Sequence, residues 1–211
     1  MLEHEYTHLG GISRLNVGRC LAIASAAVSG GIVFALLWAV DIAQSMGLPV
    51  NLPPSFFSLV GAGVVFTVLA WLLNRHAWRW RVVQAILQVP DLSGKWTCTG
   101  RTIGTNANPD FDWSGTVTIV QSWDKIRIRL KTNTSASNSK SAALVKDEAE
   151  GWRVFYSYSN DPRIGETELS AHRGFAEIVF DKDLMAGDGE YFNGHGRYTF
   201  GTMKLEKIHN G

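Results

Sequence analysis

The sequence predicts a membrane protein with an all-β soluble domain: a two-helix transmembrane hairpin followed by an up-and-down antiparallel, lipocalin-like barrel of about eight strands. Two observations support this class. Residues 20–74 hold two uncharged apolar stretches of bilayer length, and residues 91–211 alternate apolar and polar residues between turn signals. The mean hydropathy of −0.01 averages over these unlike parts. Residues 1–19 are expected to be a cytoplasmic segment and residues 75–90 a juxtamembrane helix or linker.

The two apolar stretches match the thickness of a bilayer. Cys20–Val40 has 21 residues without a charge, which form a helix about 31 Å long. Ser55–Leu73 has 19 uncharged residues and begins after Pro53-Pro54, where a helix start tolerates proline. A cleaved signal peptide has a shorter apolar run, and the lengths and lack of charge argue against core helices of a soluble fold.

Positive charges flank the hairpin at its two ends and are missing from its loop. Arg14 and Arg19 precede the hairpin, three arginines follow it, and the loop from Asp41 to Pro54 has no lysine or arginine. By the positive-inside rule, both termini and the barrel are expected in the cytoplasm. The sequence therefore predicts a multi-pass membrane protein whose residues 91–211 face the cytoplasm.

Small residues recur at fourfold spacing in both predicted spans. Ala22, Ala26 and Gly30 share one face of the first span, and Ser58 and Ala62 share one face of the second. Such faces let helix backbones approach closely in lipid. Two interpretations are open: packing within the hairpin of one chain, and packing between chains.

After Pro90 the pattern changes from helical to strand-like. Eight segments combine alternation with β-branched and aromatic residues, and most are joined by short turns, which favours a closed meander over a sandwich. The expected strands are Gly94–Ile103, Asp112–Gln121, Trp123–Lys131, Ala136–Val145, Gly151–Tyr158, Leu169–Phe180, Gly189–Asn193 and Arg197–Lys207. A barrel of this size can hold one small ligand.

The inward faces of the later strands change from apolar at one end to polar at the other. Trp96 is expected in the apolar floor of the barrel. In an antiparallel meander the end of one strand lies beside the start of the next, so the polar ends converge at one mouth. The converging residues are Tyr156, Tyr158, Asn160, His172, Asn193 and Arg197. Aromatic rings stack on bases, asparagine reads base edges, and arginine or histidine binds phosphate, so this set suits a small nucleotide.

Composition and motifs exclude several other functions. Residues 91–211 carry 15 Lys and Arg against 16 Asp and Glu, which excludes bulk electrostatic binding of DNA or RNA. Two cysteines exclude a disulfide scaffold. His172 and His195 have no metal-ligand spacing, and no nucleophile elbow or P-loop is present, so neither a metal, a cofactor nor an enzyme activity is predicted.

Four motifs carry a resemblance to a known family. They are Asp91-Leu92-Ser93-Gly94-Lys95-Trp96, Tyr156-Ser157-Tyr158-Ser159-Asn160-Asp161-Pro162, His172-Arg173-Gly174-Phe175-Ala176, and the run from Gly189 to Met203. Together with the helix hairpin, they resemble the SMODS-associating effectors of bacterial CBASS anti-phage operons, which have two transmembrane helices and a β-strand-rich domain. The last motif is the most specific, and the resemblance extends from Cys20 to the end. One departure is His195, where the family pattern leads us to expect arginine.

The resemblance implies a function. A CD-NTase-type nucleotidyltransferase would make a cyclic oligonucleotide, with a cyclic dinucleotide favoured, and the barrel would bind it. The effector would then self-associate through its membrane helices, disrupt the bacterial inner membrane and cause abortive cell death, without being an enzyme itself. The alternative from another class is a membrane-anchored, lipocalin-like binder or sensor of a small apolar ligand. That alternative predicts a dry apolar cavity.

Overall fold

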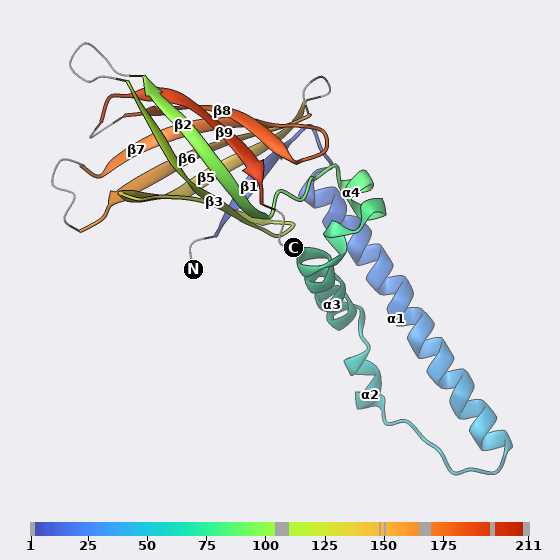
Figure 1. Cartoon of the computed structure of the whole chain (residues 1–211). Coiled ribbons are helices and arrows are strands. Elements are labelled where there is room, and N and C mark those ends of the chain that lie inside the picture. The colour runs from blue at the N-terminus through green and yellow to red at the C-terminus, as the bar shows by residue number, and fades with distance from the viewer. Residues whose placement is uncertain are drawn as a thin grey trace. The chain divides into compact units, whose positions relative to one another are not determined.

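The chain folds into two compact units. The computed structural model describes residues 3–103, 110–147, 149, 151–164, 170–194 and 197–208, without the side chains of residues 54, 58 and 59. One unit spans Ile12–Trp80, and the other joins the residues up to Gly11 with those from Arg81 onward. Figure 1 shows helices α1, α2 and α3 in the first unit and all the strands in the second.

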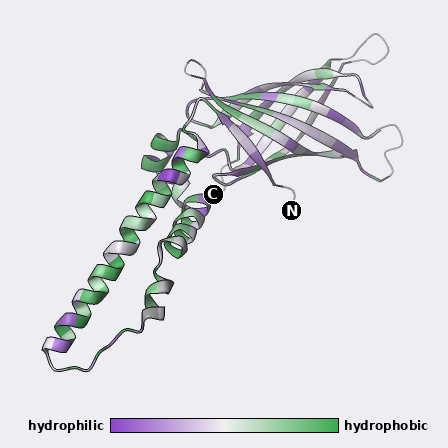
Figure 2. Cartoon of the chain, turned by 180° about the vertical axis from the view of Figure 1, so that it is seen from behind, coloured by the Kyte–Doolittle hydropathy of each residue, from purple (hydrophilic) through white to green (hydrophobic). Residues whose placement is uncertain are grey.

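The first unit is a helix hairpin whose helices extend beyond the predicted spans. Helix α1 runs from Arg14 to Ser45, and the second arm consists of α2 (Pro54–Leu59) and α3 (Ala62–Arg75). The Ser13 side chain caps α1 by accepting a hydrogen bond from the backbone N–H of Asn16, 3.3 Å away. Both arms are long and apolar enough to cross a membrane, and Figure 2 colours them mostly hydrophobic.

The two arms pack through buried serines of α1. Ser25 and Ser29 are both buried, and the Ser29 hydroxyl donates a hydrogen bond to the Val60 carbonyl. Val60 lies at the break between α2 and α3, where a carbonyl lacks its helical partner, so the serine satisfies a group that lipid could not.

The predicted small-residue face does not pack inside the hairpin. Ala22, Ala26, Gly30 and Ala62 are all exposed, while Ser58 belongs to α2 but its side chain lies outside the described residues. Among the described residues, Ser25 and Ser29 of α1 are buried instead, which favours the second interpretation, packing between chains; that interpretation stays a prediction. The face made by Ala22, Ala26 and Gly30 is thus exposed with respect to the residues that the structure describes.

The second unit is a closed barrel of nine strands, which confirms the predicted barrel and excludes the sandwich (Figure 1). Strands β2 to β9 form the predicted up-and-down antiparallel meander, and β1 is an added strand. The strands are β1 (His4–Leu9), β2 (Gly94–Ile103), β3 (Phe111–Gln121), β4 (Lys125–Thr132), β5 (Ser135–Asp147), β6 (Gly151–Pro162), β7 (His172–Phe180), β8 (Ala186–Asn193) and β9 (Phe200–Lys207).

Two parts of the chain differ from the sequence prediction. Residues 1–19 are not a separate segment, because β1 completes the barrel between β4 and β5 and α1 begins at Arg14. The helix expected through residues 75–90 is broken: a 3₁₀ turn at Ala77–Arg79 (η1) precedes the short helix α4 (Arg81–Leu87). The chain leaves helical geometry at His76, which has a φ of −131°.

Alternation along the strands fills the floor of the barrel as predicted. Ile126 and Ile128 of β4 are buried, while the basic residues that alternate with them are partly or fully exposed. The fully buried Trp96 donates a hydrogen bond from Nε1 to the Leu92 carbonyl, 3.2 Å away, and its ring packs edge-on against Phe180, 5.0 Å between centroids. The apolar floor therefore forms around Trp96.

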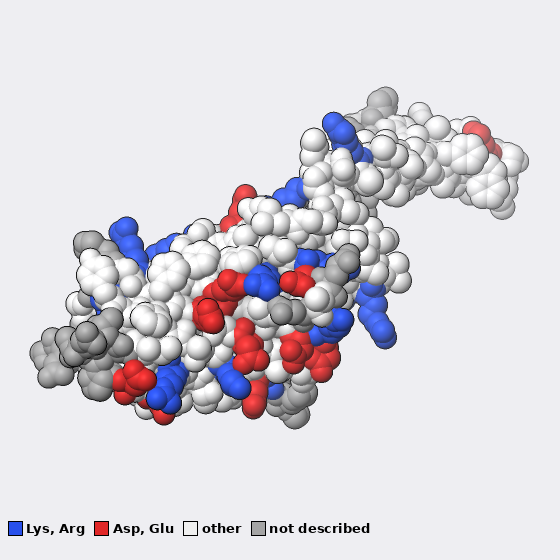
Figure 3. Space-filling view, turned by 90° about the horizontal axis from the view of Figure 1, so that it is seen from above, with Lys and Arg blue, Asp and Glu red and all other residues white. Residues whose placement is uncertain are grey.

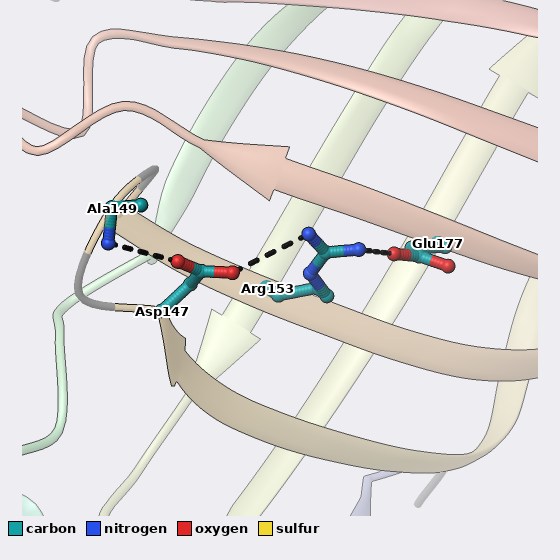
Figure 4. A network of polar contacts seen from close by, with 4 residues as sticks. All are labelled: Asp147, Ala149, Arg153 and Glu177. Carbon is teal, nitrogen blue, oxygen red and sulfur yellow. Dashed lines mark hydrogen bonds and ion pairs between the residues drawn. The ribbon is translucent and has the colours of Figure 1, made fainter.

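The outer surface of the barrel carries charges of both signs. In the view of Figure 3, basic and acidic side chains are interspersed over the barrel rather than gathered by sign. Figure 4 shows one such group, in which Arg153 of β6 bridges Asp147, 3.4 Å away, and Glu177. These part-exposed pairs link β5, β6 and β7, and such surface pairs contribute about 1 kcal/mol or less.

Candidate ligand-binding site

One cavity of about 1030 Å³ opens at the polar end of the barrel. Its lining comes from every strand of the meander β2 to β9 and from the turns at that end. The volume lies at the upper end of the usual range for small-molecule sites, about 300–1,000 Å³. All six residues predicted to converge line this cavity: Tyr156, Tyr158, Asn160, His172, Asn193 and Arg197.

A hydrogen-bonded chain fixes the rim between β6, β8 and the connection before β9. The Tyr158 hydroxyl donates to Oδ1 of Asn193 at 2.8 Å, and Nδ2 of Asn193 donates to the Thr199 hydroxyl at 2.9 Å. The backbone N–H of Asn193 also donates to the Thr199 carbonyl at 2.7 Å. Asn193 is therefore held in place by Thr199, and it positions the Tyr158 hydroxyl at the rim.

Arg197 brings a positive charge to the mouth, although not from a strand. It lies in the connection before β9, which begins at Phe200 rather than at Arg197 as predicted. Its guanidinium carbon sits 5.5 Å from the centroid of the Phe111 ring, a cation–π distance. Among the described residues it makes no ion pair, so its donors are available to an anion.

Two further polar side chains face the cavity with unused hydrogen-bonding capacity. The Tyr156 hydroxyl and the Asn160 carboxamide make no hydrogen bond within the part of the chain that the structure describes, although both residues are buried. Burial raises the pKa of both Tyr156 and Tyr158 well above the ordinary phenol value. Both phenols are therefore neutral at physiological pH and can donate a hydrogen bond or stack on a ring.

His172 is kept neutral by its surroundings. Burial lowers the pKa of its imidazole below the ordinary 6.5, and the Arg197 charge lowers it further, against opposing hydrogen bonds to Ser170 and Asn193. Its Nδ1 lies 3.1 Å from the Ser170 carbonyl, which favours the tautomer that donates from Nδ1. His195, the other histidine considered, lies outside the described residues.

The lowered pKa of His172 makes the stability of the barrel depend on pH. Below pH 6.5 the unfolded chain protonates this histidine while the folded state leaves it neutral. The free energy of unfolding therefore falls as the pH drops below 6.5, until the lower pKa of the folded state is reached. We expect His172→Gln to flatten this part of the stability profile, measured by denaturant unfolding between pH 5 and 7.5. An unchanged slope would contradict the assignment.

Sequence reasoning missed a cluster around Tyr191 that joins β8 to β2 and β3. The Tyr191 hydroxyl accepts a hydrogen bond from Nε1 of Trp113 at 3.0 Å and lies 2.7 Å from the Thr102 hydroxyl. All three line the cavity. Their role depends on which strands are neighbours in the barrel, which the local alternation pattern does not reveal.

Inward glycines leave room for the rings around the cavity. Three aromatic residues stand directly opposite a glycine on the neighbouring strand: Trp113 with Gly100, Tyr158 with Gly174 and Tyr191 with Gly201. A methyl group added at any of these glycines would meet the paired ring within 3 Å. The glycines thus let the rings lie along the barrel wall instead of filling the cavity.

The pair of Gly100 and Trp113 gives the cleanest test of this packing. A Cβ at Gly100 would lie 2.2 Å from the Trp113 ring, and its three nearest atoms all belong to that ring and none to the backbone. We expect Gly100→Ala to destabilise the barrel by about 1–3 kcal/mol, measured by denaturant unfolding. In a Trp113→Ala background the same change should cost less than about 0.5 kcal/mol. Equal costs in both backgrounds would refute the pairing.

Both units of the chain match models of known protein families. Residues 15–79 match the family model described as Cap15, TM helices, and residues 87–207 match the one described as Cap15, cyclic dinucleotide receptor domain. The CD-NTase-associated protein 15 of Yersinia aleksiciae is 38% identical over 208 residues, which cover 99% of each chain. The chain therefore belongs to the Cap15 family of CBASS effectors, in which transmembrane helices anchor a cyclic dinucleotide receptor domain.

Proposed function

We propose that the barrel binds a cyclic dinucleotide in its cavity and thereby triggers self-association of the transmembrane helices. The assembly disrupts the inner membrane and kills the infected cell before the phage matures. One observation carries the binding step: a single cavity of ligand size collects the six predicted residues around an arginine that has no ion pair among the described residues.

Arg197 is the proposed phosphate ligand. A guanidinium can bind a phosphate through two parallel hydrogen bonds, and such charge-assisted bonds are about twice as strong as neutral ones. Arg101 also lines the cavity, but its side chain is 61% exposed and pairs with Asp110 at 3.2 Å. Arg197 is therefore better placed than Arg101 to bind an anionic ligand.

Tyr156, Tyr158 and Asn160 are the proposed base-recognition residues. The two tyrosine rings lie 5.9 Å apart between centroids on one wall, where they offer flat surfaces for stacking. The Asn160 carboxamide presents a donor and an acceptor side by side and has no partner among the described residues, so it can pair with a base edge. His172, neutral and at the rim, contributes a further hydrogen-bonding group.

The proposed receptor acts without catalysis. The imidazole of His172 is engaged by the Ser170 carbonyl at 3.1 Å. Burial raises the pKa of the Cys98 thiol to about 12, which makes it a poor nucleophile at neutral pH. We therefore assign the ligand's effect to binding and assembly.

The arginines beside the hairpin support an orientation with both termini and the barrel in the cytoplasm. The ligand would reach the barrel there, supplied by a CD-NTase-type nucleotidyltransferase as the functional partner. The name of the Yersinia aleksiciae relative, CD-NTase-associated protein 15, supports this pairing. The membrane would be the inner membrane of a bacterium.

The exposed face of α1 formed by its small residues is the proposed assembly surface. Ala22, Ala26 and Gly30 are exposed on α1, whose hairpin contacts use other residues. Small residues at this spacing allow close approach of a helix from a second chain. The ligand can drive assembly only as far as it binds the assembled state more tightly than the single chain, so assembly without ligand must be unfavourable.

A binding experiment on the full chain in lipid nanodiscs tests the receptor step. Cyclic dinucleotides of different bases are titrated, with a linear dinucleotide and a fatty acid as comparisons, and thermal unfolding of the barrel is followed. Ligand at 100 times its dissociation constant should stabilise the barrel by about 2.7 kcal/mol. A shift with the fatty acid and none with any cyclic dinucleotide would contradict the proposal and favour a carrier of apolar ligands.

A further inference from the structure

Strand β1 fills a gap between β4 and β5 that the meander leaves open, which we call the β4–β5 seam. Strands β4 and β5 pair directly only where Arg129–Lys131 meets Ala136–Asn138, next to their connecting turn. Beyond that point they diverge, and β1 lies between them. It pairs antiparallel with β4 at two positions and parallel with β5 at four, from Tyr6 opposite Ala142 to Leu9 opposite Val145.

Ser139 marks the branch point of the seam. Its hydroxyl accepts a hydrogen bond from the backbone N–H of Ile128 in β4 at 2.9 Å and lies 2.7 Å from Nε2 of His4 in β1. The register of β5 against β6 shifts between Ser139 and Ser141, as expected for a β-bulge. The side chains of His4 and Ser139 and a backbone N–H of β4 therefore meet at the residue where β4 and β5 separate.

This branch point lies next to the ligand cavity. Ser139 stands directly opposite Tyr158, which lines the cavity and donates a hydrogen bond to Asn193. Ser137, two residues before Ser139 on β5, lines the cavity itself. A ligand that moves Tyr158 or β5 therefore acts on residues next to the seam.

The chain connects β1 directly to the first transmembrane helix. Only four residues separate Leu9, the end of β1, from Arg14, the start of α1. Gly10 has a φ of +83°, a conformation that glycine adopts without strain, and Gly11 follows it. Such a short glycine-containing connection can act as a hinge, so β1 can change its direction without unfolding α1.

We propose that the β4–β5 seam is a docking site for β1 of a second copy of this chain, and that the assembled effector exchanges β1 between neighbours. This rests on the proposed self-association through α1. The seam accepts this strand within one chain, and every copy carries the same strand, so exchange reproduces each contact without a new interface.

Exchange of one strand per neighbour joins the copies head to tail. Such an interface is heterologous, so it forms a ring where the rotation closes and an open chain where it does not. Release of β1 also uncovers the β5 edge at Ala142–Val145, and an unpaired strand edge is a template for another strand. The β1 strand of a neighbouring copy would pair with this edge. At one end of a growing assembly, a copy whose seam is still empty could then bind β1 of a further copy.

Cross-linking between two different variants tests the exchange directly. One chain carries Glu5→Cys and the other Lys125→Cys, both in a Cys20→Ala background, because Glu5 and Lys125 stand opposite each other in β1 and β4. Directly opposite antiparallel residues have Cβ atoms about 4.5–5.5 Å apart, close to disulfide geometry. Neither chain can form this disulfide alone. A Thr97→Cys chain, with its cysteine on the exposed face of β2, replaces the Lys125→Cys chain as the matched control.

The mixture is reconstituted in lipid, treated with the cyclic dinucleotide that stabilises the wild-type barrel, and oxidised. We expect a disulfide-linked product of two chains only with ligand, and only with the Lys125→Cys partner. Sedimentation reports assembly separately. Ligand-induced assembly without this product would overturn strand exchange and leave the proposed function standing, whereas absence of assembly would overturn both.

A single chain with both cysteines gives the second test. Its disulfide locks β1 into the seam of its own chain. We therefore expect unchanged ligand affinity but at least tenfold less assembly, and reductant should restore assembly to the wild-type level. A locked chain that assembles like the reduced chain would show that β1 does not leave its seam.

Discussion

Replacing Arg197 by methionine should weaken cyclic dinucleotide binding about 10- to 150-fold while the barrel keeps its fold. Hydrogen bonds to charged groups contribute about 1.5–3 kcal/mol each, which corresponds to this range for one lost bond. Arg197 has no ion pair among the described residues and contacts the Phe111 ring. Methionine retains an apolar contact there, so the melting temperature without ligand should change little. Calorimetric titration of the full chain measures the affinity.

The matched control is Arg101→Met. Arg101 lines the same cavity, but its exposed side chain already pairs with Asp110. Since exposed ion pairs contribute little, we expect less than about a fivefold change in affinity. Equal losses for the two variants would show that binding depends on the general positive charge of the mouth and not on Arg197.

Replacing Ala26 by leucine should abolish assembly while ligand binding stays intact. Ala26 is the centre of the exposed face that Ala22 and Gly30 complete, and close packing of helix backbones in lipid requires small residues there. The hairpin itself should be unaffected, because its contacts run through Ser25 and Ser29. We expect loss of ligand-dependent oligomers by sedimentation, and loss of toxicity when the ligand is produced in cells.

Ala24→Leu is the control for this prediction. Ala24 is also exposed, lies at a similar depth and projects from nearly the opposite side of α1, so the same change in size tests only the choice of face. If Ala24→Leu prevents assembly as strongly as Ala26→Leu, the assembly surface is not the face we propose.

Much of this architecture could be predicted from the sequence because its signals are local. The spans follow from runs without charge, and the strands of the meander follow from alternation, as Ile126 and Ile128 between basic residues illustrate. Convergence at one mouth then follows from antiparallel order alone. This is why all six candidate residues line one cavity, although their contacts with a ligand are still predictions.

The features that sequence reasoning missed depend on partners distant in the chain. Strand β1 is short and mixes histidine, glutamate and tyrosine, so it becomes a strand only when the seam between β4 and β5 supplies its edges. Ser137, Ser139 and Ser141, which alternate along β5, illustrate the same limit. Ser137 lines the cavity, but the register shift after Ser139 leaves Ser141 exposed on the outer face. The glycine and ring pairs likewise require the register between neighbouring strands.

Dye release from liposomes that contain the purified wild-type chain tests most directly whether ligand binding in the barrel controls membrane disruption. A cyclic dinucleotide that stabilises the barrel should release the dye, with half-maximal release near its dissociation constant, and the Arg197→Met and Ala26→Leu chains should release none at that concentration. Release that is equally fast without nucleotide, or intact liposomes with the barrel saturated, would contradict the account.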